Sequence, residues 1–260
     1  MSQWVLFDFD GTLSLLRVGW QAVMHDFMAE TLRAAWPNRE QGFPQAAWSR
    51  KIDEYIHAST GIQTIEQMQW LQQEVRALGV PADSIWRYKE QYRERLAAHI
   101  RDRIVRVQTG HAPADQYLVR GSVKLLEALQ ETGYTLCLAS GTDDADVHRE
   151  ASLLGIAKYF REIRGAQDHS LENPKAFLME QLLREATNLG SESRPAVIGD
   201  GPVEIALGRR HGAIAIGVAS DETGTRRHDP EKVDRLQQAG ADVIIDDLSD
   251  WPTIFKALGG

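Results

Sequence analysis

The residues best suited to chemistry form an Asp-x-Asp-Gly-Thr segment that begins at Asp8, directly after the apolar run 4–7. Asp8 offers a carboxylate that could act as a nucleophile, and Asp10 offers a second carboxylate two residues later. Gly11 allows backbone amides to approach an anion closely. The pattern therefore predicts phosphate chemistry at the end of a strand, and the alternative is an acidic turn that only closes the strand.

The elements that must position this segment alternate between two types. Short apolar runs that predict strands occupy 4–7, 134–139, 196–198, 213–218 and 242–245. Helical periodicity lies between them, for example at 122–132 and 176–186. This alternation predicts an α/β fold with a doubly wound, Rossmann-like parallel sheet, whose binding crevice lies at the carboxyl ends of the strands. Asp8 belongs at such an end.

One long segment breaks the alternation, because it shows helical periodicity alone, at 20–36, 46–57, 64–78 and 84–107. We therefore predict two domains: a core made of residues 1–14 and 119–260, and an inserted all-helical domain at 15–118.

Three segments carry a resemblance to a known family. The segment Asp8–Leu13 resembles the first motif of the haloacid dehalogenase superfamily of hydrolases, and residues 138–142, which include Ser140, resemble its second motif. Residues 197–205, with Asp200 and Glu204, resemble its fourth motif. The resemblance implies the phosphatase branch, in which a helical cap inserted between the first and second motifs closes over the site.

The resemblance also implies roles for individual residues. Asp8 is the expected nucleophile, Asp10 the acid and base, and Ser140 a hydrogen-bond donor to the transferring phosphoryl group. The third motif requires a lysine that neutralises the nucleophile and the phosphate. Lys175, in Asn-Pro-Lys, is the expected one. The alternatives are that Lys175 is only a solvated lysine in the first turn of a helix, or that Lys158 takes this role.

Magnesium is the expected cofactor, since it prefers hard oxygen ligands and keeps several waters. By resemblance, Asp8 and Asp200 supply side-chain oxygens and Asp10 its main-chain carbonyl. Glu204 is either an outer partner of this site or an acid that only favours the start of a helix.

Substrate contacts are expected from two places. Gly11, Thr12 and Gly141 belong to the turns that surround the phosphate. Arg17 and Trp20 follow the nucleophile, where the chain crosses from core to cap, and the alternative is a solvated arginine and a tryptophan that packs in the core.

The predicted function is a magnesium-dependent phosphatase that hydrolyses a small phosphate monoester, such as a sugar phosphate or similar metabolite, through an aspartyl-phosphate. The closest alternative is a sugar phosphomutase, although those relatives carry a Thr and a His after the first motif and residues 14–20 contain neither. A non-catalytic binding module with this fold is the alternative from another class.

Composition excludes several other classes. The chain has 260 residues, a net charge of −8 and 43% apolar residues, so we expect a folded protein that does not bind nucleic acid. A single cysteine, Cys137, cannot form an internal disulfide. No apolar run approaches the ~20 residues of a membrane span, and no basic leader precedes an apolar stretch. We therefore expect no membrane association and a cytoplasmic location. Neither the oligomeric state nor the physiological substrate is indicated.

Overall fold

The computed structural model describes residues 4–37, 42–188, 194–222 and 227–259 and divides the chain into two compact units. Unit 1 comprises Met1–Val18 and Arg103–Gly260, and unit 2 comprises Gly19–Asp102. The segment expected as an insertion, 15–118, extends beyond unit 2 at both ends. At the second boundary a single helix, α4 (Ile85–Gln108), continues from one unit into the other. Its helical periodicity is continuous, so the sequence does not indicate where unit 2 ends.

Unit 1 contains a six-stranded sheet in which every strand pairs in parallel with its neighbours, in the order β3-β2-β1-β4-β5-β6. The strands are β1 (Trp4–Phe7), β2 (Thr135–Asp143), β3 (Glu162–Ala166), β4 (Ala196–Gly199), β5 (Ile214–Val218) and β6 (Val243–Ile245). The predicted doubly wound parallel sheet is confirmed. One strand, β3, was not predicted, because it lies at an edge of the sheet and carries Glu162 and Arg164 where a central strand would be apolar.

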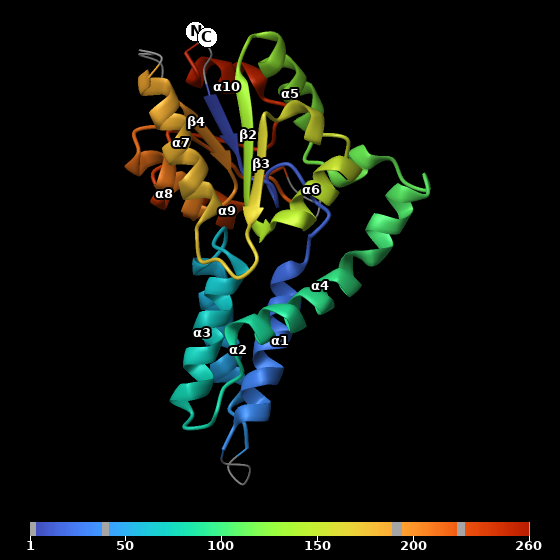
Figure 1. The fold of residues 1–260 in the computed structure, drawn as a ribbon, viewed down its shortest axis with the longest axis vertical. Helices are drawn as coiled ribbons and strands as arrows, with labels where there is room; N and C mark the ends of the chain where they lie inside the picture. The colour runs from blue at the N-terminus through green and yellow to red at the C-terminus, as the bar shows by residue number, and fades with distance from the viewer. Residues whose placement is uncertain (1–3, 38–41, 189–193, 223–226, 260) are drawn as a thin grey trace. The chain divides into compact units, whose positions relative to one another are not determined.

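Helices cover both faces of this sheet (Figure 1). The first hydrophobic core contains residues of α5 (Ser122–Glu131), α6 (Asp144–Leu153) and α10 (Trp251–Ala257). The second contains residues of α7 (Pro174–Asn188), α8 (Pro202–Arg210) and α9 (Pro230–Gln238).

Strand β1 contributes to both cores. Val5 and Phe7 belong to the first core, and Trp4 and Leu6 belong to the second. This alternation follows from the two-residue period of a strand, and burial on both faces explains why the run is apolar throughout.

Unit 2 is helical and consists of α1 (Trp20–Ala35), α2 (Gln45–Ala58), α3 (Thr64–Ala77) and most of α4. Its buried side chains include Phe27 on α1, whose ring lies 6.3 Å from that of Tyr88 and 6.2 Å from that of Tyr92, both on α4. Among the described residues, no helix is long and apolar enough to cross a membrane.

Candidate active site

The predicted motif residues meet at the carboxyl ends of three neighbouring strands. Asp8 follows β1, Ser140 lies near the end of β2, and Asp200 follows β4. Because β1 lies between β2 and β4 in the sheet, the side chains that follow these strands share one edge. The order of the strands reverses between β1 and β4. Open α/β sheets bind their ligands at the carboxyl ends of the strands beside such a reversal.

The turn after β1 is held by backbone hydrogen bonds. The amide of Asp8 donates to the carbonyl of Ile198 at 2.9 Å, and the amides of Leu13 and Ser14 both donate to the carbonyl of Phe9 at 2.9 Å. Gly11 has φ +77°, and a Cβ at this position would lie 2.2 Å from Oδ2 of Asp200. Only glycine therefore allows this turn to approach the aspartate that follows β4.

Three buried carboxylates, those of Asp8, Asp200 and Glu204, each offer an oxygen, and these oxygens all lie within 4.8 Å of one another. The hydroxyl of Thr12 lies 3.2 Å from Oδ2 of Asp8 and 3.3 Å from Oδ1 of Asp200. One hydroxyl has one hydrogen to donate, so it cannot satisfy both oxygens. Mg²⁺ prefers carboxylate oxygens that converge on one point, and here one of these oxygens is left without a hydrogen bond from Thr12. The residues present therefore fit this ion.

A buried lysine lies beside this cluster. Nζ of Lys175 is 2.7 Å from Oδ1 of Asp8 and 3.0 Å from Oε2 of Glu204. Asn173 caps the first turn of α7, since its Oδ1 accepts hydrogen bonds from the amides of Lys175 and Ala176 at 3.0 and 3.1 Å. The structure therefore brings Lys175, the lysine expected for the third motif, to Asp8. The alternative, Lys158, instead has its Nζ 4.8 Å from the ring centre of Tyr159.

Both carboxylate oxygens of Glu204 have partners. Oε2 faces Lys175, and Oε1 accepts a hydrogen bond from the amide of Gly201 at 2.6 Å. Glu204 thus caps the first turn of α8 and also contacts Lys175, and its role as an outer partner of a metal site stays a prediction. A Cβ on Gly199 would lie 2.3 Å from Cγ of Glu204, so glycine at the end of β4 makes room for this side chain.

Burial shifts the pKa values of these carboxyl groups. Burial raises the pKa of Asp8 to about 6 although Lys175 opposes the change, and burial raises the pKa of Glu204 to about 7. Burial alone would lower the pKa of Lys175, but the charges of Asp8 and Glu204 outweigh it and raise that pKa. Lys175 therefore stays cationic, and the three buried carboxylates still outnumber the two lysines that contact them, Lys175 and Lys232, which suits a divalent cation.

The second carboxylate of the motif faces β2. Oδ2 of Asp10 accepts hydrogen bonds from Thr142 at 2.8 Å and from Ser140 at 3.3 Å. Burial raises the pKa of Asp10 to about 6, although Arg17 opposes the change. Such a carboxyl group exchanges a proton close to neutral pH, as an acid–base catalyst must. Thr142 was not among the predicted site residues, although it directly follows Ser140 and Gly141 in the second motif.

A second buried lysine was also missed. Nζ of Lys232, on α9, lies 2.7 Å from Oδ2 of Asp200 and 2.8 Å from Oε1 of Glu222. Burial alone would lower the pKa of Lys232, but Asp200 and Glu222 raise it. A lysine on a charged, amphipathic helix normally indicates a solvated face, so the sequence contains no signal for this contact.

The other residues predicted to bind substrate lie in several different elements. Arg17 contacts Glu150 and Asp146 of α6 within unit 1. Trp20 begins α1 in unit 2. Gly141 lies within β2, between Ser140 and Thr142. Substrate binding by these residues, and by Gly11 and Thr12, stays a prediction.

Cys137 is buried in β2 without a disulfide, and burial raises its pKa to about 12.

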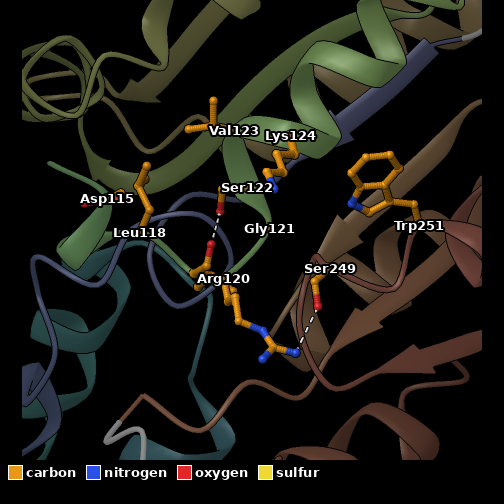
Figure 2. A pocket seen from close by; sticks show the side chains of 10 residues that line it. Asp115, Leu118, Arg120, Gly121, Ser122, Val123, Lys124, Ser249 and Trp251 are labelled. Carbon is orange, nitrogen blue, oxygen red and sulfur yellow. Dashed lines mark hydrogen bonds between the residues drawn. The ribbon is translucent and has the colours of Figure 1, made fainter.

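Unit 1 also contains a cavity of about 560 Å³ that includes none of the predicted site residues (Figure 2). It lies between the start of α5 and the segment that leads into α10. Arg120 donates a hydrogen bond to Oγ of Ser249 there at 3.1 Å, and the side chains of Trp251 and Lys124 also line the cavity.

Comparison with known proteins gives a family match. The family model of haloacid dehalogenase-like hydrolases matches residues 3–212. A search of curated proteins finds no match.

Solved structures share the fold. A β-phosphoglucomutase from Clostridium difficile has a TM-score of 0.62 and 15% sequence identity, over 100% of this chain and 98% of its own. A predicted phosphatase from Clostridium acetobutylicum has a TM-score of 0.58 and 15% identity, over 98% and 99%. A hydrolase from Pseudomonas syringae has a TM-score of 0.56 and 19% identity, over 98% of each chain. At these identities the likeness concerns the fold.

Proposed function

Because the chain belongs to the haloacid dehalogenase-like hydrolases, we propose that it is a magnesium-dependent phosphatase that acts on a small phosphorylated metabolite. The observation that supports this most strongly is the buried contact between Asp8 and Lys175 at 2.7 Å, with Asp200 in the same acidic cluster. A carboxylate at a strand end, beside a permanent cation and a set of hard oxygens, has the parts that a phosphoryl-transfer nucleophile requires.

The proposed reaction has two steps. In the first, an oxygen of Asp8 forms a bond to phosphorus while the bond from phosphorus to the alcohol oxygen breaks, and Asp10 gives that oxygen a proton. In the second, a water molecule attacks the phosphorus of the aspartyl-phosphate, Asp10 takes a proton from the water, and the Asp8 carboxylate is regenerated with release of inorganic phosphate. Asp10 alternates between acid and base, which its raised pKa favours.

Several groups around Asp8 would stabilise the negative charge on the phosphoryl oxygens. Lys175 lies at the nucleophile, and we propose that Ser140 and the backbone amides of the turn after Asp8 donate hydrogen bonds to these oxygens. Asp8 and Asp200 would hold magnesium with their side chains, and Asp10 with its main-chain carbonyl. When bound, the ion supplies positive charge that polarises the phosphoryl group.

Unit 2 is the proposed cap. It is helical and interrupts unit 1 between the first and second motifs, and we propose that it excludes water and selects the substrate. The fold shared with a β-phosphoglucomutase keeps a sugar phosphomutase as the second candidate. The two differ in their product, because only a phosphatase releases inorganic phosphate in proportion to the substrate consumed.

The test is a screen of phosphorylated sugars, polyols, nucleotides and glycolate, with inorganic phosphate as the readout. We expect turnover that requires Mg²⁺ and a fall in kcat of roughly 10⁴-fold or more in Asp8→Asn, since nucleophile replacements have effects of this size or larger. Mass spectrometry of acid-quenched enzyme should locate a phosphoryl group on Asp8. An adduct on another residue, or full activity of Asp8→Asn, would exclude the proposed mechanism.

A further inference from the structure

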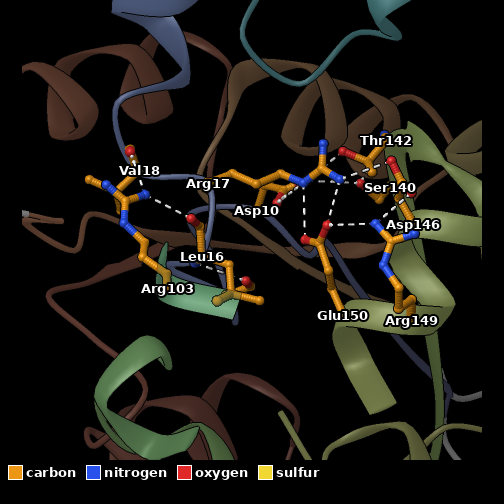
Figure 3. A network of polar contacts seen from close by, with 11 residues as sticks. Asp10, Leu16, Arg17, Val18, Arg103, Ser140, Thr142, Asp146, Arg149 and Glu150 are labelled. Atoms are coloured by element: carbon orange, nitrogen blue, oxygen red, sulfur yellow. Dashed lines mark hydrogen bonds and ion pairs between the residues drawn. The ribbon is translucent and has the colours of Figure 1, made fainter. Parts of the chain in front are cut away.

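A group of charged side chains around Arg17 lies outside all four motifs (Figure 3). Nε of Arg17 donates to Oε2 of Glu150 at 3.0 Å, and Nη2 donates to Oε1 of the same residue at 2.6 Å. Nη2 also donates to Asp146 at 3.3 Å. Glu150 is fully buried on α6. A two-pronged arginine–carboxylate pair fixes the plane of the guanidinium more strictly than a single contact does.

This group reaches the candidate acid–base residue. Nε of Arg17 lies 3.7 Å from Oδ1 of Asp10. The other oxygen, Oδ2, is held by Ser140 and Thr142 of β2. Among the described residues none donates a hydrogen bond to the buried Oδ1 atom. The carboxyl group is therefore anchored at Oδ2, while Oδ1 faces the guanidinium of Arg17.

The backbone that carries Arg17 is held as well. Nη1 of Arg103 donates to the carbonyls of Leu16 and Val18, each at 2.7 Å, so both neighbours of Arg17 in the chain are tied to one side chain. Arg149 adds a second contact to the acids of α6, since its Nη2 lies 2.7 Å from Oδ1 of Asp146. Arg17 is thus fixed from the backbone side and from the guanidinium side.

We propose that Arg17, held by Glu150, is a positioning residue that orients the Asp10 carboxyl group for proton transfer to and from the substrate oxygen. This inference rests on the proposed phosphatase function. The pair does not touch the reacting atoms. It acts by restricting rotation of the Asp10 side chain, so that the carboxyl group keeps one orientation for proton transfer.

The leaving group distinguishes this role from a structural one. An alkyl phosphate loses a basic alkoxide and needs the proton from Asp10 as the bond from phosphorus to oxygen breaks. p-Nitrophenyl phosphate loses a stabilised phenolate and needs it far less. General acid catalysis contributes roughly 10²–10⁴-fold, so misplacing the acid should slow the alkyl ester much more than the aryl ester. A loss of folding or of phosphate binding would slow both.

The experiment measures kcat on p-nitrophenyl phosphate and on the alkyl phosphate that the wild-type enzyme hydrolyses best, for Arg17→Met, Glu150→Gln and the double variant. We expect the ratio of alkyl to aryl kcat to fall at least about tenfold in each single variant. Because Glu150 acts through Arg17, the double variant should lower the ratio no further than Arg17→Met does. The matched control is Arg161→Met, which removes an exposed ion pair with Glu185 and should leave the ratio unchanged.

Arg17→Lys keeps a cation but loses the two-pronged contact, and it should give a smaller fall of the ratio in the same direction even where Arg17→Met does not fold. Equal losses on both esters, or a change confined to KM, would overturn the positioning role while leaving the phosphatase proposal intact. A wild-type enzyme that hydrolyses neither ester would overturn the phosphatase proposal itself.

Discussion

At the scale of single residues, Asp200 has two competing demands on its carboxylate. It is the proposed magnesium ligand, yet Nζ of Lys232 already lies 2.7 Å from its Oδ2 atom. At this separation two unit charges interact by several kcal/mol even at an effective dielectric constant of about 20. Lys232 therefore stabilises the site when no metal is bound and weakens the binding of Mg²⁺ to Asp200.

We expect Lys232→Met to bind Mg²⁺ more tightly than the wild-type protein, as measured by isothermal titration calorimetry. Without the ion the variant should be less stable by about 3–5 kcal/mol, because Asp200 and Glu222 lose the cation between them. Added Mg²⁺ should consequently raise its Tm by more than it raises that of the wild type.

The control for this prediction is Lys256→Met, on an exposed residue of α10, which should change neither quantity. Weaker magnesium binding in Lys232→Met would show that Lys232 supports the metal site and does not compete with the ion.

At the scale of elements, the site depends on how closely two turns approach each other. The turn after β1 reaches the turn after β4 at Gly11, where a Cβ would lie 2.2 Å from Oδ2 of Asp200. The parallel pairing of β1 and β4 sets the distance between these turns. Any side chain at position 11 must therefore displace either the nucleophile turn or the proposed metal ligand.

Gly11→Ala and Gly133→Ala form a matched pair that isolates this effect. Gly11 has φ +77° and Gly133 has φ +88°, but a Cβ on Gly133 would meet nothing within 4 Å. Gly133→Ala should lose only the roughly 1–2 kcal/mol that an L-residue requires in this conformation. Gly11→Ala should lose clearly more in urea unfolding and should bind Mg²⁺ more weakly. If Gly11→Ala and Gly133→Ala lose the same stability, the turns after β1 and β4 can move apart at no cost in free energy.

At the scale of the whole molecule, the chain leaves unit 1 and returns to it at two residues that lie close together. Val18 is the last residue of unit 1 before the insertion and Arg103 the first after it, and the Arg103 side chain donates to the Val18 carbonyl at 2.7 Å. The two ends of the insertion are therefore close enough to be joined by a short linker.

Replacing residues 19–102 with a short Gly/Ser linker should leave a folded unit 1 with weak, unselective activity. The reason is that a proposed cap adds binding energy from parts of the substrate remote from phosphorus, and the shortened protein lacks it. The measurement is kcat/KM over the substrate screen, with circular dichroism to verify folding. A shortened protein that keeps the wild-type order of substrates would place selectivity in unit 1.

Part of this molecule follows from local sequence patterns. The strand that ends at Phe7, the Asp-x-Asp-Gly-Thr turn and the alternation of strands and helices are set by the burial and turn preferences of neighbouring residues. These patterns predicted the doubly wound sheet and the strand ends where Asp8 and Asp200 meet. They missed β3, because an edge strand does not need the continuous apolar pattern of a buried one.

The contacts that Lys232 and Arg17 make with buried acids were decided by tertiary structure alone. Lys232 reaches Asp200 from 32 positions along the chain, and Arg17 pairs with Glu150 across 133 positions. In the sequence each of these is a charged residue of ordinary surface type, for which solvation is the default expectation. Only the packing of α6 and α9 on the sheet removes these side chains from water, and a buried charge must then find a partner of opposite sign.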